Sequence, residues 1–288
     1  MLTIVAVKGD LHVLDQGRAA RAVAAVRYGE SVQRSETGLT NFRDVGGLLT
    51  AAGSPTRSGV LYRSDVPLAG DDVPEGAAVW PPRTVVDLRS PGEWRGSAHP
   101  LADAAEVRRR PVVTDEVDRG AAAGRELPGN ADLGAYFTTM YIRWLERRGD
   151  AVTAAVAAVL DSPGPTLVHC AAGRDRTGVV VALLLRAAGV EAGEIVADYR
   201  RTEGNIKACM ARLARAGALG SVPLDADFVT PAAIEAVLGH VDRTYGGVRG
   251  WLTMRGVSEA QLEQWVDRIV GSEPHDHRPV LREADPMP

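Results

Sequence analysis

The sequence predicts an α/β fold, in which a central, mostly parallel sheet is flanked by helices and followed by a helical C-terminal region. Short apolar runs rich in β-branched residues occur at 84–88 and 166–168. Such runs are typical of buried parallel strands, and helical patterns follow them along the chain. The loop at 169–176 leaves a predicted strand and opens a helix, and ligands bind at such loops in parallel sheets.

The composition is that of an ordinary globular chain. It has 288 residues, of which 45% are hydrophobic and 24% are charged, a length that suits one large domain or two small ones. The formal net charge of -4 gives no basic footprint, so we expect no nucleic-acid partner. Only Lys8 and Lys207 among the 33 Lys and Arg residues are lysines. Coding bias explains most of this excess, although arginine also binds phosphate in a bidentate manner.

The cysteine count and the apolar stretches bear on compartment. Cys170 and Cys209 are the only cysteines, too few for a disulfide scaffold, and no Cys/His cluster has the spacing of a structural zinc site. The first apolar run is too short for a signal-peptide core, and the run at 179–185 is far below the about 20 residues that span a bilayer. We expect a cytoplasmic protein without stable membrane insertion; non-classical secretion and the oligomeric state stay open.

The chain divides into an N-terminal extension at 1–37, a main domain at 38–271 and a tail at 272–288, which we expect to be disordered. Within the extension, the apolar runs at 2–7 and 11–14 suit a small hairpin, and a helical pattern follows at 19–27.

Three strands and two loops are expected before the first long helix. The strand candidates are 60–63 after the turn at 52–59, 84–88, and a strand marked by Val107 and 112–113. Residues 71–82 are expected to be a loop with helix fragments. Residues 114–130 are polar, glycine-rich and acidic, which is typical of a long surface loop.

Helices dominate the rest of the chain. Apolar side chains recur at three- and four-residue spacing over 132–160, of which 151–160 is predicted to be buried. Pro163, Gly164 and Pro165 then break the chain before the strand at 166–168. The later helix candidates are 177–188, 192–201, 206–215, 231–245, 248–255 and 258–270. Thr230-Pro231 has the pattern of a helix start, and Ser258 with Gln261 has capping-box spacing.

The loop after the strand at 166–168 carries the chemistry. Cys170 leaves the strand, and Arg176 follows after five intervening residues. The loop amides of Ala171, Ala172 and Gly173 can turn inward as an anion-binding nest, and the helix N-terminus adds partial positive charge. Such a site binds a tetrahedral oxyanion such as phosphate, and the same field stabilises the thiolate of Cys170.

A thiolate beneath a phosphoryl group is an in-line nucleophile. Arg176 would chelate two phosphate oxygens, and the hydroxyl of Thr177 would donate to the departing sulfur. Gly173 would let the loop turn its amides inward. The alternative is a structural cysteine at a strand end, with Arg176 paired to a carboxylate. The preceding strand and His, the internal Gly and the following Thr-Gly favour the chemical interpretation.

The loop also resembles a known signature. HCAAGRDRTG at 169–178 matches HCxxGxxRTG of the protein tyrosine phosphatase superfamily, and looks most like the bacterial branch that usually has HCxAGKDRTG. Further segments that resemble this branch are NFRDVGG at 41–47, LYRS at 61–64, VDLRS at 86–90, IVADY at 195–199, and short matches at 245–246 and 256–258. The resemblance covers roughly residues 38–270.

The resemblance implies a tyrosine-phosphatase-like fold with a helical lid. It implies an enzyme that hydrolyses phosphomonoesters through a phosphocysteine intermediate, with no metal and no cofactor. The substrate would be a phosphotyrosine protein, with broad specificity as an extension of that activity. The alternatives are a phosphoinositide phosphatase with weak protein activity and a non-catalytic phosphate-binding pseudophosphatase. Intact Cys170, Asp175, Arg176 and Thr177 argue against the latter.

The general acid has more than one candidate. The resemblance points first to Asp175 inside the signature, whose alternative role is to hold the loop by hydrogen bonds. Asp87 at a strand end is second, and the acids of 114–132 follow. Arg174 stands where the family has lysine and would keep a cationic phosphate contact. The predicted substrate-binding set is Ala171, Ala172, Gly173, Arg174, Asp87 and Arg63.

Other residues receive simpler interpretations. His169 is expected to shape the loop as a buried hydrogen-bonding partner, and Cys209 to be a core thiol. Arg43 and Asp44 are expected to be a structural salt-bridge element rather than substrate contacts, and Arg89 is a further candidate for lining the pocket. The aromatic residues at 136–141 have helical spacing and belong by default to the core, although the family lid would also place an aromatic wall there.

Overall fold

The computed structural model describes residues 2–7, 10–15, 38–94, 96–114, 132–218 and 229–271. The predicted helix at 19–27, almost all of the loop at 114–130 and the tail lie outside these residues. The predicted hairpin is confirmed, since β1 (Leu2–Val7) pairs antiparallel with β2 (Asp10–Asp15).

A five-stranded sheet with the order β3-β4-β7-β5-β6 forms the centre of the main domain. Its strands are β3 (Arg43–Asp44), β4 (Leu61–Ser64), β5 (Thr84–Asp87), β6 (Glu106–Arg109) and β7 (Thr166–His169). All neighbours are parallel except β3, which pairs antiparallel with β4. The α/β fold with a mostly parallel sheet is therefore confirmed.

The strand register brings the candidate residues to one edge of the sheet. His169 at the end of β7 lies opposite Ser64 of β4 on one side and Asp87 of β5 on the other. Because parallel strands end at the same edge, three segments distant in sequence meet where the signature loop begins. The central strands β4, β5 and β7 are buried along their whole length, which explains the two apolar residues that each of them carries.

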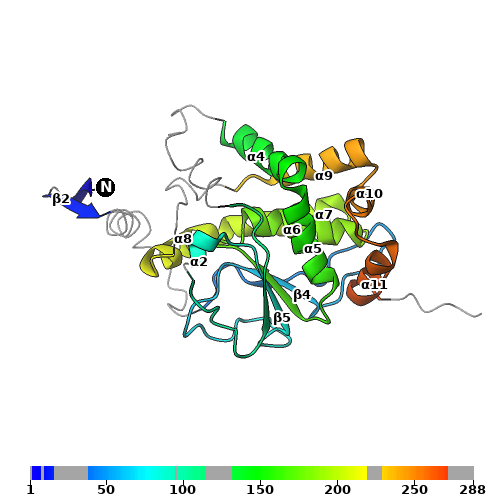
Figure 1. Ribbon diagram of the computed structural model, residues 1–288, viewed down its shortest axis with the longest axis horizontal. Helices are drawn as coiled ribbons and strands as arrows, with labels where there is room; N and C mark the ends of the chain where they lie inside the picture. Colours follow the sequence, from blue (N-terminus) through cyan, green and yellow to red (C-terminus); the bar gives the residue numbers. More distant parts are fainter. Residues whose placement is uncertain are drawn as a thin grey trace, which may run out of the picture.

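The two faces of the sheet are covered differently. Alternate residues such as Leu61, Val86 and Val168 face the main core, which the helices complete. The intervening Tyr62, Val85 and Leu167 face a smaller cluster, against which Phe42, Trp80 and Leu101 from loop segments pack. Figure 1 shows α5 and α6 against the sheet and α4 and α9 farther out.

The helices have the following bounds: α2 (Pro91–Trp94), α4 (Leu133–Arg147), α5 (Gly149–Leu160), α6 (Asp175–Ala187), α7 (Ala192–Arg200), the 3-10 helix η1 (Arg201–Gly204), α8 (Ile206–Arg215), α9 (Pro231–Tyr245), α10 (Val248–Thr253) and α11 (Glu259–Ile269). The predicted capping box is confirmed, since Ser258 Oγ accepts from the Gln261 amide and the Gln261 side chain accepts from the Ser258 amide. Among the described residues, no helix is both long and apolar enough to cross a membrane.

The structure refines some local predictions and corrects others. The stretch at 132–160 is helical as predicted, but it consists of two helices, because Arg148 leaves helical geometry with φ -125° and ψ 23°. Residues 112–113 are buried but lie in a bend beyond β6. The predicted helix start at Thr230-Pro231 is confirmed, since α9 begins at Pro231 with Thr230 before it, but the Thr230 side chain makes no capping hydrogen bond and its buried hydroxyl has no hydrogen-bond partner among the described residues. Residues 71–82 form turns without helix, whereas the short helix α2 was not predicted.

Candidate active site

The signature loop lies between β7 and α6. Helix α6 begins at Asp175, two residues before the predicted start, so that Asp175 occupies its first turn. The apolar residues from 179 to 185 are all buried, which anchors the helix in the core. Cys170 is 2% exposed, directly beyond the strand. The N-terminus of α6 thus points its partial positive charge at the loop that follows the nucleophile candidate.

The loop carbonyls are held from outside the loop. The Cys170 oxygen lies 3.0 Å from His169 Nδ1, the Ala171 oxygen accepts from the Val66 amide at 2.9 Å, the Ala172 oxygen accepts from Asn41 Nδ2 at 3.0 Å, and the Gly173 oxygen accepts from Arg63 Nη2 at 3.0 Å. In a planar trans peptide the N–H points opposite to the C=O. The amides of the following residues therefore face the opposite side, as an anion-binding nest requires.

Gly173 is required by both conformation and space. Its φ is 66°, in the left-handed region that L side chains rarely adopt. A Cβ at this position would also lie 2.2 Å from the backbone oxygen of Ser64. The loop can therefore pass close to β4 only with glycine at this position.

A buried ion cluster supports the loop from beneath. Asp198 of α7 accepts from Arg43 Nε at 2.7 Å and from Arg63 Nη1 at 2.6 Å, and all three side chains are almost fully buried. Burial is the largest influence on the Asp198 pKa and would raise it, but the two guanidinium groups outweigh burial and lower the pKa. Arg63 was predicted to bind substrate, and the structure places it here, with Nη2 on the Gly173 carbonyl.

Arg43 and Asp44 were predicted to be a structural salt-bridge element. Arg43 does form a buried salt bridge, with Asp198, while Asp44 accepts from the amides of Gly46 and Gly59 at 2.8 and 2.6 Å. Neighbouring residues on the two-residue strand β3 point to opposite faces, so Arg43 and Asp44 reach different partners.

Asp175 receives hydrogen bonds from two elements. Arg174 Nε lies 2.9 and 3.0 Å from the two Asp175 oxygens, and its guanidinium is 5.1 Å from the Phe137 ring centre. The Tyr141 hydroxyl of α4 makes a short hydrogen bond to Asp175 Oδ1 and lies 2.9 Å from the Tyr199 hydroxyl. Burial and the Asp175 charge raise the Tyr141 pKa well above its usual value, so Tyr141 donates.

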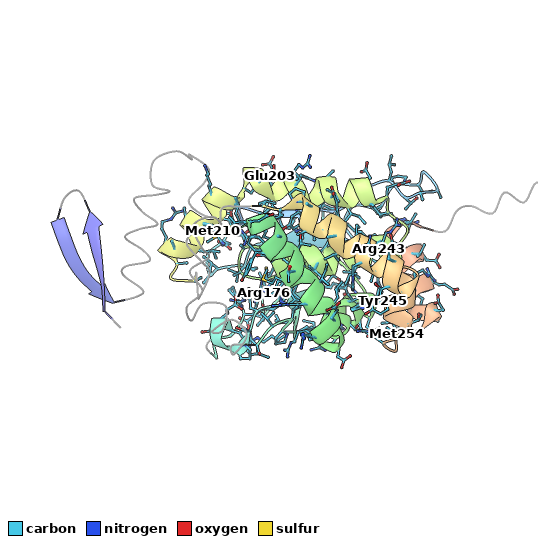
Figure 2. The ribbon with its side chains drawn as sticks, turned by 90° about the horizontal axis from the view of Figure 1, so that it is seen from above. Arg176, Glu203, Met210, Arg243, Tyr245 and Met254 are labelled. Carbon is cyan, nitrogen blue, oxygen red and sulfur yellow. The ribbon has the colours of Figure 1, made fainter. Side chains whose placement is uncertain are left out.

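Arg176 pairs with a carboxylate that the sequence interpretation missed. Its Nη1 and Nη2 lie 2.5 and 2.8 Å from the two oxygens of Glu93 on α2. Burial would raise the Glu93 pKa, but Arg176 outweighs burial and lowers it. Arg176 lies toward the α2 end of the fold, away from Tyr245 and Met254 (Figure 2).

Asp87 is close to the loop but fully buried. Arg89 binds it through Nε and Nη2 at 2.9 and 2.7 Å, and His169 Nε2 lies 3.8 Å from its Oδ1. Burial would raise the Asp87 pKa, yet its interactions with His169 and Arg89 lower it below the ordinary value. Asp87 and Arg89 thus engage each other as a buried pair next to the strand ends.

One hydroxyl group, on Thr177, and one thiol, on Cys209, complete the site. The Thr177 hydroxyl is buried and has no hydrogen-bond partner among the described residues. Cys209 is buried on α8 with Sγ 3.7 Å from the Ala172 oxygen, and burial raises its pKa well above the usual value. Cys209 therefore contacts the loop while lying within the core.

Sequence reasoning missed four supporting residues: Glu93, Asn41, Asp198 and His99. Asn41 and Asp198 lie in segments that already resembled the family, so those segments were a usable signal. Glu93 and His99 follow the strand β5 in a region where no pattern was recognised. Of the aromatic residues at 136–141, Phe137 and Tyr141 contact Arg174 and Asp175, while Tyr136 is 36% exposed.

Comparison with known proteins extends these observations. Residues 35–271 match the model of the tyrosine phosphatase family. The chain is 28% identical over 277 residues to the triple specificity protein phosphatase PtpB of Mycobacterium tuberculosis, covering 83% of this chain and 99% of that protein. It is 30% identical over 224 residues to a putative tyrosine-protein phosphatase of Cupriavidus necator, covering 74% and 80%. A tyrosine-protein phosphatase of Nostoc commune is 36% identical over 141 residues, covering 45% and 47%.

Proposed function

This chain belongs to the tyrosine phosphatase family and is a phosphoric monoester hydrolase, and we propose that it dephosphorylates phosphotyrosine proteins through a phosphocysteine intermediate on Cys170. One observation carries this proposal: the carbonyls of residues 170–173 are all held from outside the loop. The amides that face the other way, together with the N-terminus of α6, would bind the phosphate oxygens above Cys170.

In the first step, Cys170 Sγ attacks phosphorus in line with the leaving oxygen. A sulfur–phosphorus bond forms while the bond to the substrate oxygen breaks. Arg176 and the loop amides stabilise the charge on the three remaining phosphoryl oxygens. Asp175 gives its proton to the leaving oxygen, which departs as the neutral tyrosine side chain.

In the second step, water attacks the phosphocysteine. Asp175 accepts a proton from that water, the sulfur–phosphorus bond breaks, and inorganic phosphate leaves. The Thr177 hydroxyl, which is buried without a hydrogen-bond partner among the described residues, donates to the departing thiolate. We prefer Asp175 to Asp87 as the proton donor, because the Asp175 side chain is 21% exposed within the loop, whereas the Asp87 side chain is fully buried.

The relative from Mycobacterium tuberculosis is named a triple specificity phosphatase. We therefore extend the proposal to broad specificity, in which phosphoserine and phosphothreonine are slower substrates. Arg174, which stands where the family has lysine, would act on substrate through Asp175, since its Nε contacts both carboxylate oxygens.

A rapid-quench experiment tests the mechanism. With a ³²P-labelled phosphotyrosine peptide, the wild-type protein should show acid-stable label on the chain before phosphate is released. Cys170→Ser should show neither label nor turnover. Turnover that persists in Cys170→Ser would overturn the mechanism. The same assay with phosphoserine and phosphothreonine peptides and with short-chain phosphoinositides tests specificity. Faster turnover of the phosphoinositides than of the peptides would show that the preferred substrate is a lipid and not a protein.

A further inference from the structure

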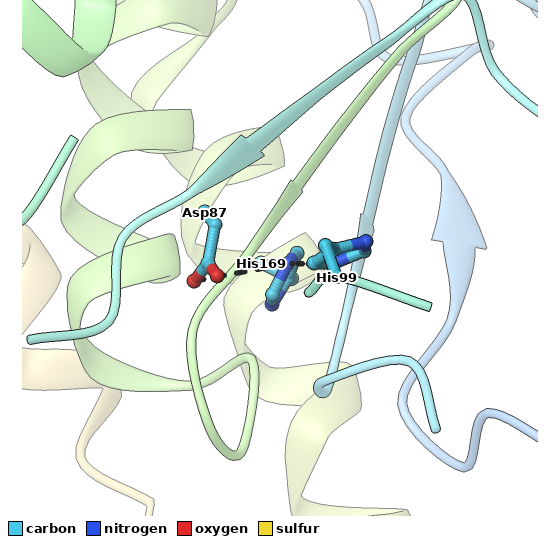
Figure 3. A group of neighbouring side chains, drawn as sticks. All are labelled: Asp87, His99 and His169. Carbon is cyan, nitrogen blue, oxygen red and sulfur yellow. Dashed lines mark hydrogen bonds and ion pairs between the residues drawn. The ribbon is translucent and has the colours of Figure 1, made fainter. Parts of the chain in front are cut away.

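Two histidines form a hydrogen-bonded chain behind the signature loop. The Leu101 amide donates to His99 Nδ1 at 3.1 Å, His99 Nε2 lies 3.0 Å from His169 Nε2, and His169 Nδ1 lies 3.0 Å from the Cys170 oxygen. Figure 3 shows His169 between Asp87 and His99. Both imidazoles are buried. The chain therefore runs from a loop amide to the carbonyl of the nucleophile.

The Leu101 amide determines which ring nitrogen carries the proton in each histidine of this chain. His99 Nδ1 accepts from an amide, so a neutral His99 carries its proton on Nε2. His99 then donates to His169 Nε2, which must be an acceptor. His169 consequently carries its proton on Nδ1 and donates to the Cys170 oxygen. A charged His169 would bring two N–H groups face to face across 3.0 Å, and a charged His99 would turn an N–H toward the Leu101 amide across 3.1 Å.

The same chain argues against a metal ion. Asp87, His99 and His169 are the one group of three ligand side chains found among the described residues, with ligand atoms within 4.8 Å of one another. A metal on His99 Nε2 needs a lone pair there, which moves the proton to Nδ1. That proton would face the Leu101 amide. Asp87 already binds Arg89 through both oxygens.

We propose that His99 is a positioning residue, whose Nε2–H fixes His169 in the Nδ1-protonated tautomer and so keeps the Cys170 carbonyl turned away from the phosphate site. The inference rests on the proposed function, because the amide of Ala171 in the same peptide plane then faces the phosphate. His99 acts only through His169 and does not touch the reacting atoms.

Charged groups around the pair favour its neutral form. Arg89 and Arg109 face His99, while Arg89 and Arg176 face His169, and Asp87 is the opposing anion. Burial is the largest cause that lowers both histidine pKa values, and the arginines add to it. The neutral pair is thus compatible with the electrostatics of its surroundings.

Two substitutions at His99 distinguish the effect of losing its N–H donor from the effect of losing its volume. His99→Leu fills a similar volume but has no N–H, whereas His99→Gln keeps an amide N–H that can reach His169 Nε2. We expect His99→Leu to lower kcat for an aryl phosphate and to weaken binding of inorganic phosphate, each by about 10- to 100-fold, the size of effect that a misplaced group produces. For His99→Gln, both kcat and the affinity for inorganic phosphate should stay within about threefold of the wild-type values.

Nitrogen-15 NMR of histidine-labelled wild-type protein reads the tautomers directly. At pH 7 we expect an Nε2–H signal for His99 and an Nδ1–H signal for His169, and His99→Leu should allow His169 to exchange between tautomers. The inference would be overturned by the opposite tautomers in the wild-type protein, or by equal losses of kcat and phosphate affinity in His99→Leu and His99→Gln. One bound zinc ion per chain after dialysis against zinc and then buffer would also overturn it.

The measurements distinguish this inference from the proposed function. If the wild-type protein hydrolyses the phosphotyrosine peptide but no labelled chain forms, the phosphocysteine mechanism fails. The NMR measurement of the histidine tautomers still tests the role of His99 in that case. If His99→Leu does not fold, the tautomers of the wild-type protein decide the matter alone.

Discussion

Glu93 of α2 binds both terminal nitrogens of Arg176, at 2.5 and 2.8 Å, and both side chains are largely buried. The carboxylate fixes the plane and direction of the guanidinium fork, which is rigid and bidentate. A side chain about eighty positions away in the sequence thus orients the arginine of the signature loop.

Glu93→Gln should lower kcat/KM for an aryl phosphate by about tenfold, mainly through a higher KM, because a neutral amide no longer holds the fork bidentately. Steady-state kinetics and inhibition by inorganic phosphate measure this. The matched control is Glu106→Gln, which alters the exposed pair with Arg108 on β6. If both variants behave like the wild type, Glu93 does not orient Arg176.

Asp175→Asn should slow the hydrolysis of esters with poor leaving groups far more than that of activated esters. A poor leaving group needs its proton during bond cleavage, whereas an activated one leaves as an anion. A series of aryl phosphates with graded leaving-group acidity measures the difference. Equal losses across the series would show that Asp175 only holds the loop.

Tyr141→Phe should reduce turnover of poor leaving groups several-fold, because the Tyr141 hydroxyl orients the Asp175 carboxylate. It should also lower the free energy of unfolding by about 1 kcal/mol, since a buried hydrogen bond is lost. Tyr199→Phe is the control, because it keeps the bond between Tyr141 and Asp175. Equal kinetic effects in both variants would contradict the orienting role.

Gly173→Ala should abolish phosphate binding and destabilise the fold. The new Cβ would meet the Ser64 backbone oxygen at 2.2 Å in addition to the strain of positive φ. Gly189→Ala is the matched control, since Gly189 has φ 83° with nothing within 4 Å of the Cβ position. We expect the free energy of unfolding to fall by about 1 kcal/mol in the control and by more in Gly173→Ala, as measured by denaturant unfolding. Similar values would mean that the loop can move away from β4.

Acid should destabilise the protein partly through His99. Its pKa falls from 6.5 to about 3 on folding, chiefly through burial. Below pH 6.5 the unfolded chain binds a proton that the folded chain does not, so stability is full above pH 6.5 and declines as pH falls toward 3. His99→Gln should flatten this decline between pH 6.5 and 4.5. Parallel unfolding curves for wild type and variant over this range would refute the assignment.

The sequence could predict the chemistry of the loop because the relevant residues are adjacent. Cys170, Gly173, Asp175, Arg176 and Thr177 lie within eight positions, and the strand before them and the helix after them follow from local apolar patterns. Segments 41–47 and 195–199 were also recognised, though without their partners.

Apart from His169, which the sequence already suggested as a buried partner of the loop, only the tertiary structure decided which groups hold that loop. The other donors to its carbonyls come from β4, from the chain before β3 and from the loop beyond β4, and Glu93 and His99 follow β5. These contacts depend on strand order and register, which place β4, β5 and β7 side by side at one edge. Arg63 and Asp87 therefore belong to buried pairs beneath or beside the loop. A pairing between side chains far apart in sequence is fixed by packing, which local pattern does not encode.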